Sequence, residues 1–392
     1  MLDVLIAGAG PGGVAAAVAL KRRAPDLRVR VIDRATFPRD KPCGGGLTGH
    51  AAEAMVALGL EVTVPSVDAP RGIVTFGDEE RAVTLARPVR VIRRDAFDAS
   101  LVVQARDAGI EVVEKVALRS LVVDADGVTA QTTGGELRAR VLVGADGAAS
   151  IVRKHLGPRT PTPLRLFRAF VPMPAGWAHG DAMIYDFSLL RRGLRGYLWL
   201  FPAPDGMLNV GVMHTPTVEL SGAAIEALLH EGLARFGVTV PAGASRGWPA
   251  WAYTPRAAVA APRVLALGDA AGIDALTGEG IAVAMEHALV CADAIATGFD
   301  RNDLTFGGYR RALRRATVGR ELALDGWLAR LLYGSGWKFW LPLVLYDPVV
   351  LELYAARVAG GLVLADQKAR LWSALARHLA VLPARWWRLR KS

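Results

Sequence analysis

Cysteine is scarce in this 392-residue sequence, and its scarcity excludes one class of protein. Cys43 and Cys291 are the only two cysteines, and they lie far apart in the chain. Small secreted proteins held together by disulfides carry many cysteines at close spacing. A signal peptide is also missing, because the apolar run Leu2–Ala7 follows the initial methionine directly. We therefore expect a cytoplasmic protein.

Histidines at metal-ligand spacing are missing as well. Zinc sites bring together histidines and cysteines in short, regular patterns. Here the histidines are scattered through the sequence, and none pairs with either cysteine in such a pattern. The sequence therefore predicts no metal site. The histidines concerned are His50, His155, His179, His214, His230, His287 and His378.

Uninterrupted apolar runs long enough to cross a bilayer are not found in the C-terminal quarter. Residues 337–345 and 349–354 are apolar, but Asp347-Pro348 interrupts them, and a membrane-spanning helix needs about 20 apolar residues. Two interpretations of residues 301–392 remain open. They form a helical cap on the core, or a face peripheral to the inner side of the cytoplasmic membrane. Trp386 and Trp387, flanked by arginines, suit a lipid headgroup region.

The charge is strongly unbalanced, with a formal net charge of +10. Such an excess is typical of proteins that bind nucleic acid or anionic membranes, but also of an arginine-rich composition without a functional meaning. The basic residues are not gathered into an arm with interleaved aromatics, so we expect no nucleic-acid partner. With 52% hydrophobic residues, the chain is long enough for a large core.

A glycine-rich turn dominates the N-terminus. Gly8-Ala9-Gly10-Pro11-Gly12-Gly13 fits the pattern G-x-G-x-x-G between a predicted strand and a helix. In that pattern the glycines make a tight turn, let the backbone approach a pyrophosphate, and let helix and strand pack closely. Asp33 ends the next predicted strand 20 residues after Gly13 (33 − 13), where an acid binds ribose hydroxyls. The segment predicts a bound dinucleotide.

The rest of the chain predicts an α/β protein with a Rossmann-like domain. Strand patterns occur in residues 112–143, 164–251 and 264–267. Helices are expected at residues 51–58, 95–108, 218–236, 280–297 and through most of 320–392.

Three later segments resemble the flavoprotein monooxygenase and reductase superfamily. Residues 143–153 resemble its G-A-D-G-x-x-S-x-V-R motif around Asp146, and residues 267–272 resemble its G-D-A-A-G signature. Arg94 with Phe97-Asp98 resembles its R-x-x-F-D element. The resemblance implies FAD as the dinucleotide, with Asp269 on the ribityl chain and Arg94 near the phosphates.

Three further segments resemble the geranylgeranyl reductase family within the p-hydroxybenzoate hydroxylase-like superfamily. Residues 41–47 resemble its C-G-G-G-L loop, residues 196–202 its Y-x-W-x-F-P signature, and residues 277–281 its T-G-E-G-I segment. Residues 273–276 form a shorter connection than is common in the family and lack its proline. The resemblance covers about residues 1–300.

That resemblance implies a domain plan. Residues 1–163 form the FAD-binding domain, with short inserted segments at 60–90, and residues 164–255 form an antiparallel-sheet substrate domain. Residues 256–300 return to the FAD-binding domain, and residues 301–392 form a helical, apolar C-terminal region. We expect an FAD-dependent reductase that saturates C=C bonds of a geranylgeranyl-type chain. No second G-x-G-x-x-G occurs, so NAD(P)H or another external electron donor has no Rossmann domain of its own.

The candidate catalytic residues are Cys43, Tyr197 and Trp199. Cys43 lies beside three glycines, and it is either a proton donor or positioning group or only a small residue in a loop against the cofactor. Tyr197, Trp199 and Phe201 alternate with leucines, so all three face one side of a strand. They form either an aromatic wall for an isoprenoid or an ordinary sheet core. Cys291 is expected in the core.

The cofactor-binding candidates share positions in or beside the motifs above. They are Gly8, Gly10, Pro11, Gly12, Gly13, Asp33, Arg34, Cys43, Gly44, Arg94, Val116, Asp146, Gly268, Asp269, Gly278, Gly280 and Ile281.

Other functions on the same fold remain open. A flavin monooxygenase would hydroxylate a hydrophobic or aromatic molecule. A related halogenase would need a lysine between flavin and substrate, and residues 42–114 contain none. A flavoprotein without catalytic activity would act only as a binding or electron-transfer partner at a membrane.

Overall fold

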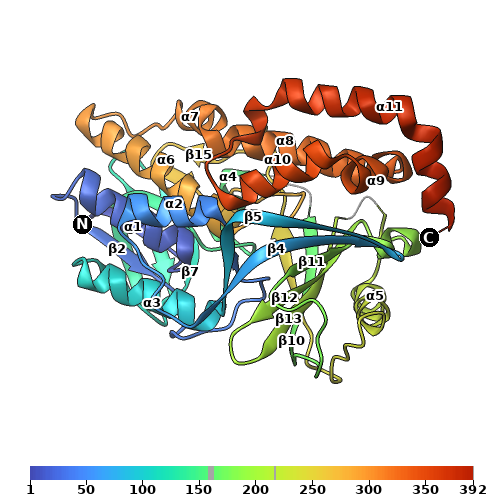
Figure 1. Cartoon of the computed structure of the whole chain (residues 1–392). Helices are drawn as coiled ribbons and strands as arrows, with labels where there is room; N and C mark the ends of the chain where they lie inside the picture. The colour runs from blue at the N-terminus through green and yellow to red at the C-terminus, as the bar shows by residue number, and fades with distance from the viewer. Residues whose placement is uncertain (158–162, 216–217, 392) are drawn as a thin grey trace.

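Two β-sheets and a layer of helices make up the computed structural model, which describes residues 1–157, 163–215 and 218–391 (Figure 1). The helices of the C-terminal quarter lie along one side of both sheets, and the two ends of the chain lie on opposite sides of the molecule (Figure 1).

The first sheet is the predicted Rossmann-like sheet. β1 pairs in parallel with β2 and β9, and β6 and β16 extend the parallel order on either side. β7, β8 and β9 form an antiparallel meander at one edge. Its strands are β1 (Leu2–Ala7), β2 (Val29–Ile32), β6 (Glu111–Val113), β7 (Leu118–Val123), β8 (Val128–Thr132), β9 (Gly135–Gly144), β15 (Ala260–Ala261) and β16 (Val264–Ala266).

The second sheet is largely antiparallel and extends beyond the predicted range of residues 164–255. Three strands from the N-terminal part of the chain join it, and β4 pairs in parallel with β11. In spatial order its strands are β14 (Arg246–Trp251), β10 (Pro163–Pro172), β13 (Met207–His214), β12 (Gly196–Ala203), β11 (Met183–Asp186), β4 (Ser66–Phe76), β5 (Glu79–Ile92) and β3 (Gly46–Leu47).

The helices predicted in the first three quarters of the chain are confirmed. Pro11 occupies the first turn of α1, where its missing N–H costs nothing, and α1 packs against α6. Ser221 caps α5 by accepting a hydrogen bond from the backbone N–H of Ala224, so that helix begins after residue 218. These helices are α1 (Pro11–Arg23), α2 (Gly49–Leu58), α3 (Arg94–Asp107), α5 (Gly222–Ala234) and α6 (Ile281–Asp300), whereas the short α4 (Ile151–Leu156) was not predicted.

The C-terminal region is helical, as predicted. A buried ion-pair cluster ties two of its helices together, because the Arg357 guanidinium binds both carboxylate oxygens of Asp325 at 2.6 and 2.7 Å and lies 2.8 Å from Glu321. The helices are α7 (Tyr309–Arg315), α8 (Thr317–Leu332), α9 (Trp337–Tyr346), α10 (Pro348–Ala359) and α11 (Lys368–Lys391). The side chains of residues 385–391 lie outside the described part of the chain.

Within the described residues, α6 is long and apolar enough to span a membrane by length and composition, but 67% of its most apolar stretch is buried inside the protein. α9 and α10 pass the same test only together, and they are bent by 78° at residue 347. One or two such helices are weak evidence for a span, since core helices of soluble proteins have the same composition.

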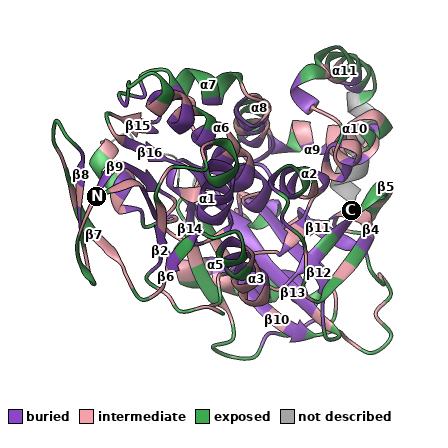
Figure 2. Ribbon diagram, turned by 90° about the vertical axis from the view of Figure 1, so that its left-hand side faces the viewer, coloured by how far each residue is buried: buried purple, intermediate pink, exposed green. Residues whose placement is uncertain are grey.

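β12 shows how the second sheet is covered on both faces. Tyr197, Trp199 and Phe201 belong to a buried cluster shared with α8 and α9, whereas Leu198 and Leu200 belong to one shared with α5. The central strands of this sheet are accordingly buried along their length (Figure 2). The predicted alternation of β12 is therefore confirmed.

Candidate active site

A cavity of about 430 Å³ opens at the carboxyl ends of β1 and β2 and continues to the second sheet. In α/β sheets, ligands bind at this edge. The structure brings every predicted catalytic and cofactor-binding residue to the wall of this cavity except Gly13. The N-termini of α1 and α6 both reach it, through Pro11 and Ile281, and helix N-termini favour negative charge.

The glycine turn leaves room for a ligand and none for larger side chains. Gly8 has φ 108°, and a Cβ there would lie 2.2 Å from the carbonyl oxygen of Ala145. Gly13 lies behind the turn, where a Cβ would stand 1.8 Å from the Gly8 carbonyl oxygen. By contrast, a Cβ at Gly10 would meet nothing closer than Arg39 at 3.5 Å, so the backbone there faces open space. Gly13 therefore shapes the turn without lining the cavity.

Asp33 fixes the turn and reaches the cavity. One carboxylate oxygen accepts a hydrogen bond from the Ala9 N–H at 2.8 Å, and the other accepts one from the Ala35 N–H at 2.8 Å. The side chain thus bridges the glycine turn and the end of β2, with its edge toward the cavity. That is the placement an acid needs to accept hydrogen bonds from ribose hydroxyls.

Asp146 has one committed and one uncommitted oxygen. Oδ2 accepts a hydrogen bond from the Ile151 N–H at 2.7 Å at the start of α4. Oδ1 is buried and has no hydrogen-bond partner among the described residues. Burial raises the pKa of this carboxyl, although Ser150 and the α4 backbone oppose the shift. A buried acceptor without a partner fits a hydroxyl donor from a bound ligand.

Lys41 lies in the cavity and binds Asp269. Its ammonium is 2.7 Å from the Asp269 carboxylate. Burial alone would raise the pKa of Asp269, but Lys41 and, more weakly, Arg94 and Arg39 lower it below its usual value. Lys41 stands one position before the lysine-free stretch of residues 42–114. The Lys41 ammonium is thus paired with the Asp269 carboxylate of the cofactor site.

Arg94 is buried and committed to one acid. It binds Asp98 in bidentate fashion at 2.8 and 2.7 Å, and Arg39 lies 3.0 Å from the same carboxylate. Burial would lower the pKa of Arg94, but Asp98 raises it, with a smaller contribution from Cys43. Arg94 thus stays charged at the cavity wall while Asp98 fixes its orientation.

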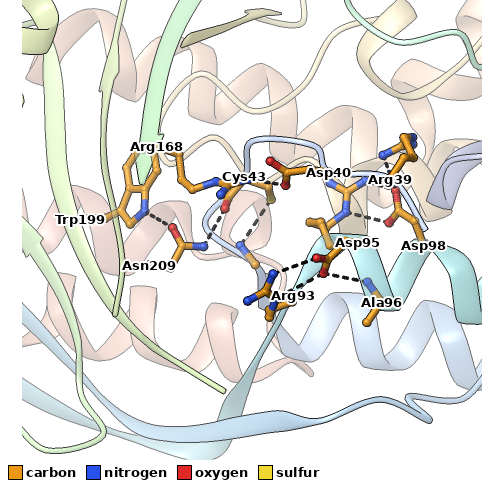
Figure 3. Close-up of polar contacts among 12 residues, drawn as sticks. Arg39, Asp40, Cys43, Arg93, Asp95, Ala96, Asp98, Arg168, Trp199 and Asn209 are labelled. Carbon is orange, nitrogen blue, oxygen red and sulfur yellow. Dashed lines mark hydrogen bonds and ion pairs between the residues drawn. The ribbon is translucent and has the colours of Figure 1, made fainter. Parts of the chain in front are cut away.

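The Cys43 loop is joined to β12 through a residue that the sequence analysis missed. Asn209, on β13, donates to the Cys43 carbonyl at 2.7 Å and accepts from the Trp199 indole N–H at 3.1 Å (Figure 3). The Cys43 thiol itself accepts a hydrogen bond from the Gly45 N–H at 3.4 Å. The available signal in the sequence was a polar residue within the apolar run of residues 207–213. The bridge sets the distance between loop and aromatic wall.

Four rings form the wall of the cavity on the side of the second sheet. Tyr185 lies 5.5 Å from Tyr197 and 5.1 Å from Phe201 between ring centroids, and Trp199 stands between those two along β12. The Tyr197 hydroxyl donates to the Thr277 carbonyl, which ties the wall to the loop before α6. Gly44 packs directly on this wall, since a Cβ there would lie 2.9 Å from Phe201.

Asp274 holds the short loop that departs from the family pattern. Its carboxylate is fully buried and accepts hydrogen bonds from the backbone N–H groups of Leu276 at 2.6 Å and Thr277 at 2.8 Å. The Thr277 hydroxyl donates to it as well. A buried acid thus fixes the conformation of this short loop.

A second cavity of about 400 Å³ adjoins the first, and its wall is almost entirely apolar. α8, α9, α10 and α11 supply most of it, with β4, β5 and β11 opposite. Sequence patterns did not predict this cavity, because its residues come from segments that lie far apart in the sequence. Six residues line both cavities: Met183, Tyr185, Tyr197, Thr277, Tyr354 and Val358.

The residues of the first cavity fit FAD. The glycine turn leaves the backbone open toward a pyrophosphate, Asp33 faces the ribose position, and Asp146 offers an acceptor without a partner. Among the described residues, no group of three or more histidine, cysteine or acidic side chains could hold a metal ion.

Comparison with known proteins supports the same cofactor. Residues 1–182 match the family described as the FAD binding domain. Two relatives are a menaquinone reductase from Mycolicibacterium smegmatis, 29% identical over 94% of this chain and 95% of that protein, and a digeranylgeranylglycerophospholipid reductase from Methanoculleus marisnigri, 27% identical over 76% and 78%. A geranylgeranyl bacteriochlorophyll reductase-like protein from Thermoplasma acidophilum has the same fold, with a TM-score of 0.75, 18% identity and 99% of both chains covered.

Proposed function

We propose that this chain, which is an FAD-dependent oxidoreductase of the geranylgeranyl reductase-like group, saturates C=C bonds of a geranylgeranyl-type prenyl chain. The observation that carries the proposal is the apolar cavity that adjoins the cofactor cavity at Tyr185 and Tyr197. Its size and apolar wall suit a long hydrocarbon and offer little to a polar molecule. The names of the two relatives, which refer to a quinone and a lipid, support a substrate of this kind.

Each part of the site has a task in this proposal. FAD supplies the two-electron reduction when it is bound. Asp33, Asp146 and the glycine turn would hold its adenosine and phosphate parts, and Asp269, paired with Lys41, would bind the ribityl chain. The aromatic wall orients the alkene and keeps water out of the reacting volume. NAD(P)H or another external donor reduces the cofactor.

An anaerobic experiment separates this function from the monooxygenase alternative. The holoenzyme is reduced with dithionite, a geranylgeranyl lipid or prenylated quinone is added, and the flavin absorbance is followed. We expect the flavin to reoxidise without oxygen, because the alkene accepts the electrons. A product that gains one oxygen only after air is admitted would indicate a monooxygenase, and a substrate left unchanged in both cases would indicate a binding protein.

We also propose that the mouth of the apolar cavity contacts the cytoplasmic face of a membrane. Trp327 and Trp372 line the cavity and are 43% and 63% exposed. Each has an exposed cation one turn away on its helix, Arg330 on α8 and Lys368 on α11. Tryptophan beside a cation suits a headgroup region, and a prenyl chain could then enter without crossing water.

Vesicle flotation tests this contact. The double variant Trp327→Ser/Trp372→Ser is expected to reduce binding to anionic vesicles about tenfold, because two interfacial anchors are lost. Val122→Ser is the matched control, since Val122 is 61% exposed on β7 in the first sheet. A chain truncated before Arg385 measures the contribution of the tail. Equal binding of the double variant and the control would contradict the contact.

A further inference from the structure

We infer that Glu279 is the acid that supplies the proton when a double bond is saturated in this site. The inference rests on the proposed function and adds a residue to it. Glu279 stands between Gly278, which has φ 72°, and Gly280, where the chain enters α6. Its side chain lines the cofactor cavity, on the same loop as Thr277, which lines both cavities.

Among the described residues of the cavity wall, Glu279 is the carboxyl group that accepts a hydrogen bond from neither a backbone N–H nor a cationic side chain. Asp33 and Asp146 accept hydrogen bonds from backbone N–H groups, Asp269 binds Lys41, and Asp40 binds Arg168. Within the described part of the chain, the Glu279 carboxyl accepts a hydrogen bond from the Thr48 hydroxyl, at Oε1. Glu279 lines the cofactor cavity, and no hydrogen bond to its other carboxylate oxygen is found within the described residues. A carboxyl that no direct hydrogen bond from a cation or an amide holds ionised is able to carry a proton to a ligand.

The surroundings of Glu279 favour the protonated form. Burial raises its pKa above the usual value, and Asp274 adds to the shift. Arg357 on α10, together with Thr48 and His50, opposes it without reversing it. Tyr185, across the cavity, is uncharged because burial raises the pKa of its hydroxyl. A raised carboxyl pKa is what a general acid needs near neutral pH.

Two further titratable groups, His50 and Glu286, lie near Glu279, and His50 influences the pKa of Glu279. Thr48 caps α2, and His50 follows in its first turn. The His50 ring lies 3.6 Å from Glu286, which is on α6 two turns beyond Glu279 and has 23% of its side chain exposed. Glu286 raises the pKa of His50, whereas burial lowers it. This pair gives the Glu279 carboxylate a route to regain a proton from water.

The reaction balances with these groups. Saturation breaks one π bond and forms two C–H bonds. One hydrogen arrives with two electrons from the reduced flavin, which becomes oxidised. The other arrives as a proton from the Glu279 carboxyl, which is left as a carboxylate and is reprotonated through His50 and Glu286.

The test compares Glu279→Gln with the surface control Glu219→Gln in the holoenzyme. Glutamine keeps the shape and the Thr48 contact but cannot release a proton at this pH. We expect Glu279→Gln to keep FAD bound. Anaerobic reoxidation of the flavin by the prenyl substrate should slow about 100-fold or more. The dependence of the reoxidation rate on the protonation of an acidic group should disappear from the pH profile. In the wild type, the absorbance spectrum of the bound, oxidised FAD should change with pH as a carboxyl group of raised pKa titrates. Glu279→Gln should lack this change. The control variant should match the wild type in FAD binding, in the reoxidation rate, in the pH profile of that rate and in the spectral titration.

Two outcomes would overturn the inference. The first is a Glu279→Gln enzyme that has the rate and the pH profile of the wild type. The second is an FAD spectrum that changes with pH in the same way in the wild type and in Glu279→Gln. Cys43→Ala and Tyr185→Phe test the competing donors, and loss of the pH limb in either of them alone would assign the proton to that residue instead. If the wild type shows the titration but reduces no prenyl substrate, the proposed function fails while the placement of the acid stands.

Discussion

Gly13→Val is expected to yield a protein that retains no FAD after purification. A Cβ at this position would lie 1.8 Å from the Gly8 carbonyl oxygen and 3.3 Å from the Ala145 Cβ, and neither backbone can move away without opening the turn. We expect FAD affinity to fall about 100-fold or more and the free energy of unfolding to fall by about 3 kcal/mol. The flavin absorbance of the purified protein measures the retained FAD, and thermal unfolding measures the loss of stability.

Gly326→Ala is the matched control for this prediction. Gly326 lies within α8, and a Cβ there would meet nothing within 4 Å. Alanine in a helix should stabilise the protein by about 0.5–1 kcal/mol and leave FAD bound. If Gly13→Val fails to fold, Gly13→Ala, which adds only the Cβ, measures the same clash. Full FAD occupancy in Gly13→Ala would show that the turn does not depend on this glycine.

Val358→Trp is expected to abolish turnover of long prenyl substrates while FAD remains bound. Val358 lines both cavities, and it lies one turn beyond Tyr354 on α10, at the point where the cavities adjoin. An indole there fills the passage, so we expect kcat/KM for a geranylgeranyl substrate to fall about 100-fold or more. Steady-state assays with substrates of different chain length measure it.

The loss should depend on the size of the new side chain. Val358→Ala widens the same passage and should keep most of the activity, and Val122→Trp adds an indole on the exposed face of β7. FAD absorbance separates a blocked passage from a damaged cofactor site. Turnover of the long substrate by Val358→Trp at the wild-type rate would show that the chain does not pass between the cavities.

The cofactor site could be predicted from the sequence because its contacts are local. The glycine turn, Asp33, Asp146 and Asp269 each follow a strand or open a helix, and the sheet brings the carboxyl ends of such strands to one edge. Arg94 was predicted near phosphates; the structure adds that Asp98 holds its guanidinium from behind.

The apolar cavity and the Asn209 bridge could not be predicted in the same way. The cavity arises where C-terminal helices meet β4, β5 and β11, and no single segment carries its pattern. β4 and β5 reach the second sheet from a segment that looked like an insertion in the first domain. Asn209 joins the Cys43 loop, 166 positions before it in the sequence, to Trp199 on the neighbouring strand β12. Such contacts depend on packing, which periodicity does not encode.

Lys41 illustrates a further limit of the sequence argument. The halogenase alternative was weighed on the absence of lysine from residues 42–114, and Lys41 lies just outside that stretch yet inside the cavity. What matters is its partner, because the Asp269 carboxylate holds its ammonium at 2.7 Å. Only the structure shows that pairing.

The most direct test of the proposed reduction is the mass of the product after a single anaerobic turnover. The dithionite-reduced holoenzyme is mixed with a geranylgeranyl substrate, quenched and analysed by mass spectrometry. The arrangement of the two cavities predicts a product heavier by two hydrogens for each bound flavin that reoxidises. An unchanged substrate under anaerobic conditions, with a gain of one oxygen when air is admitted, would contradict it.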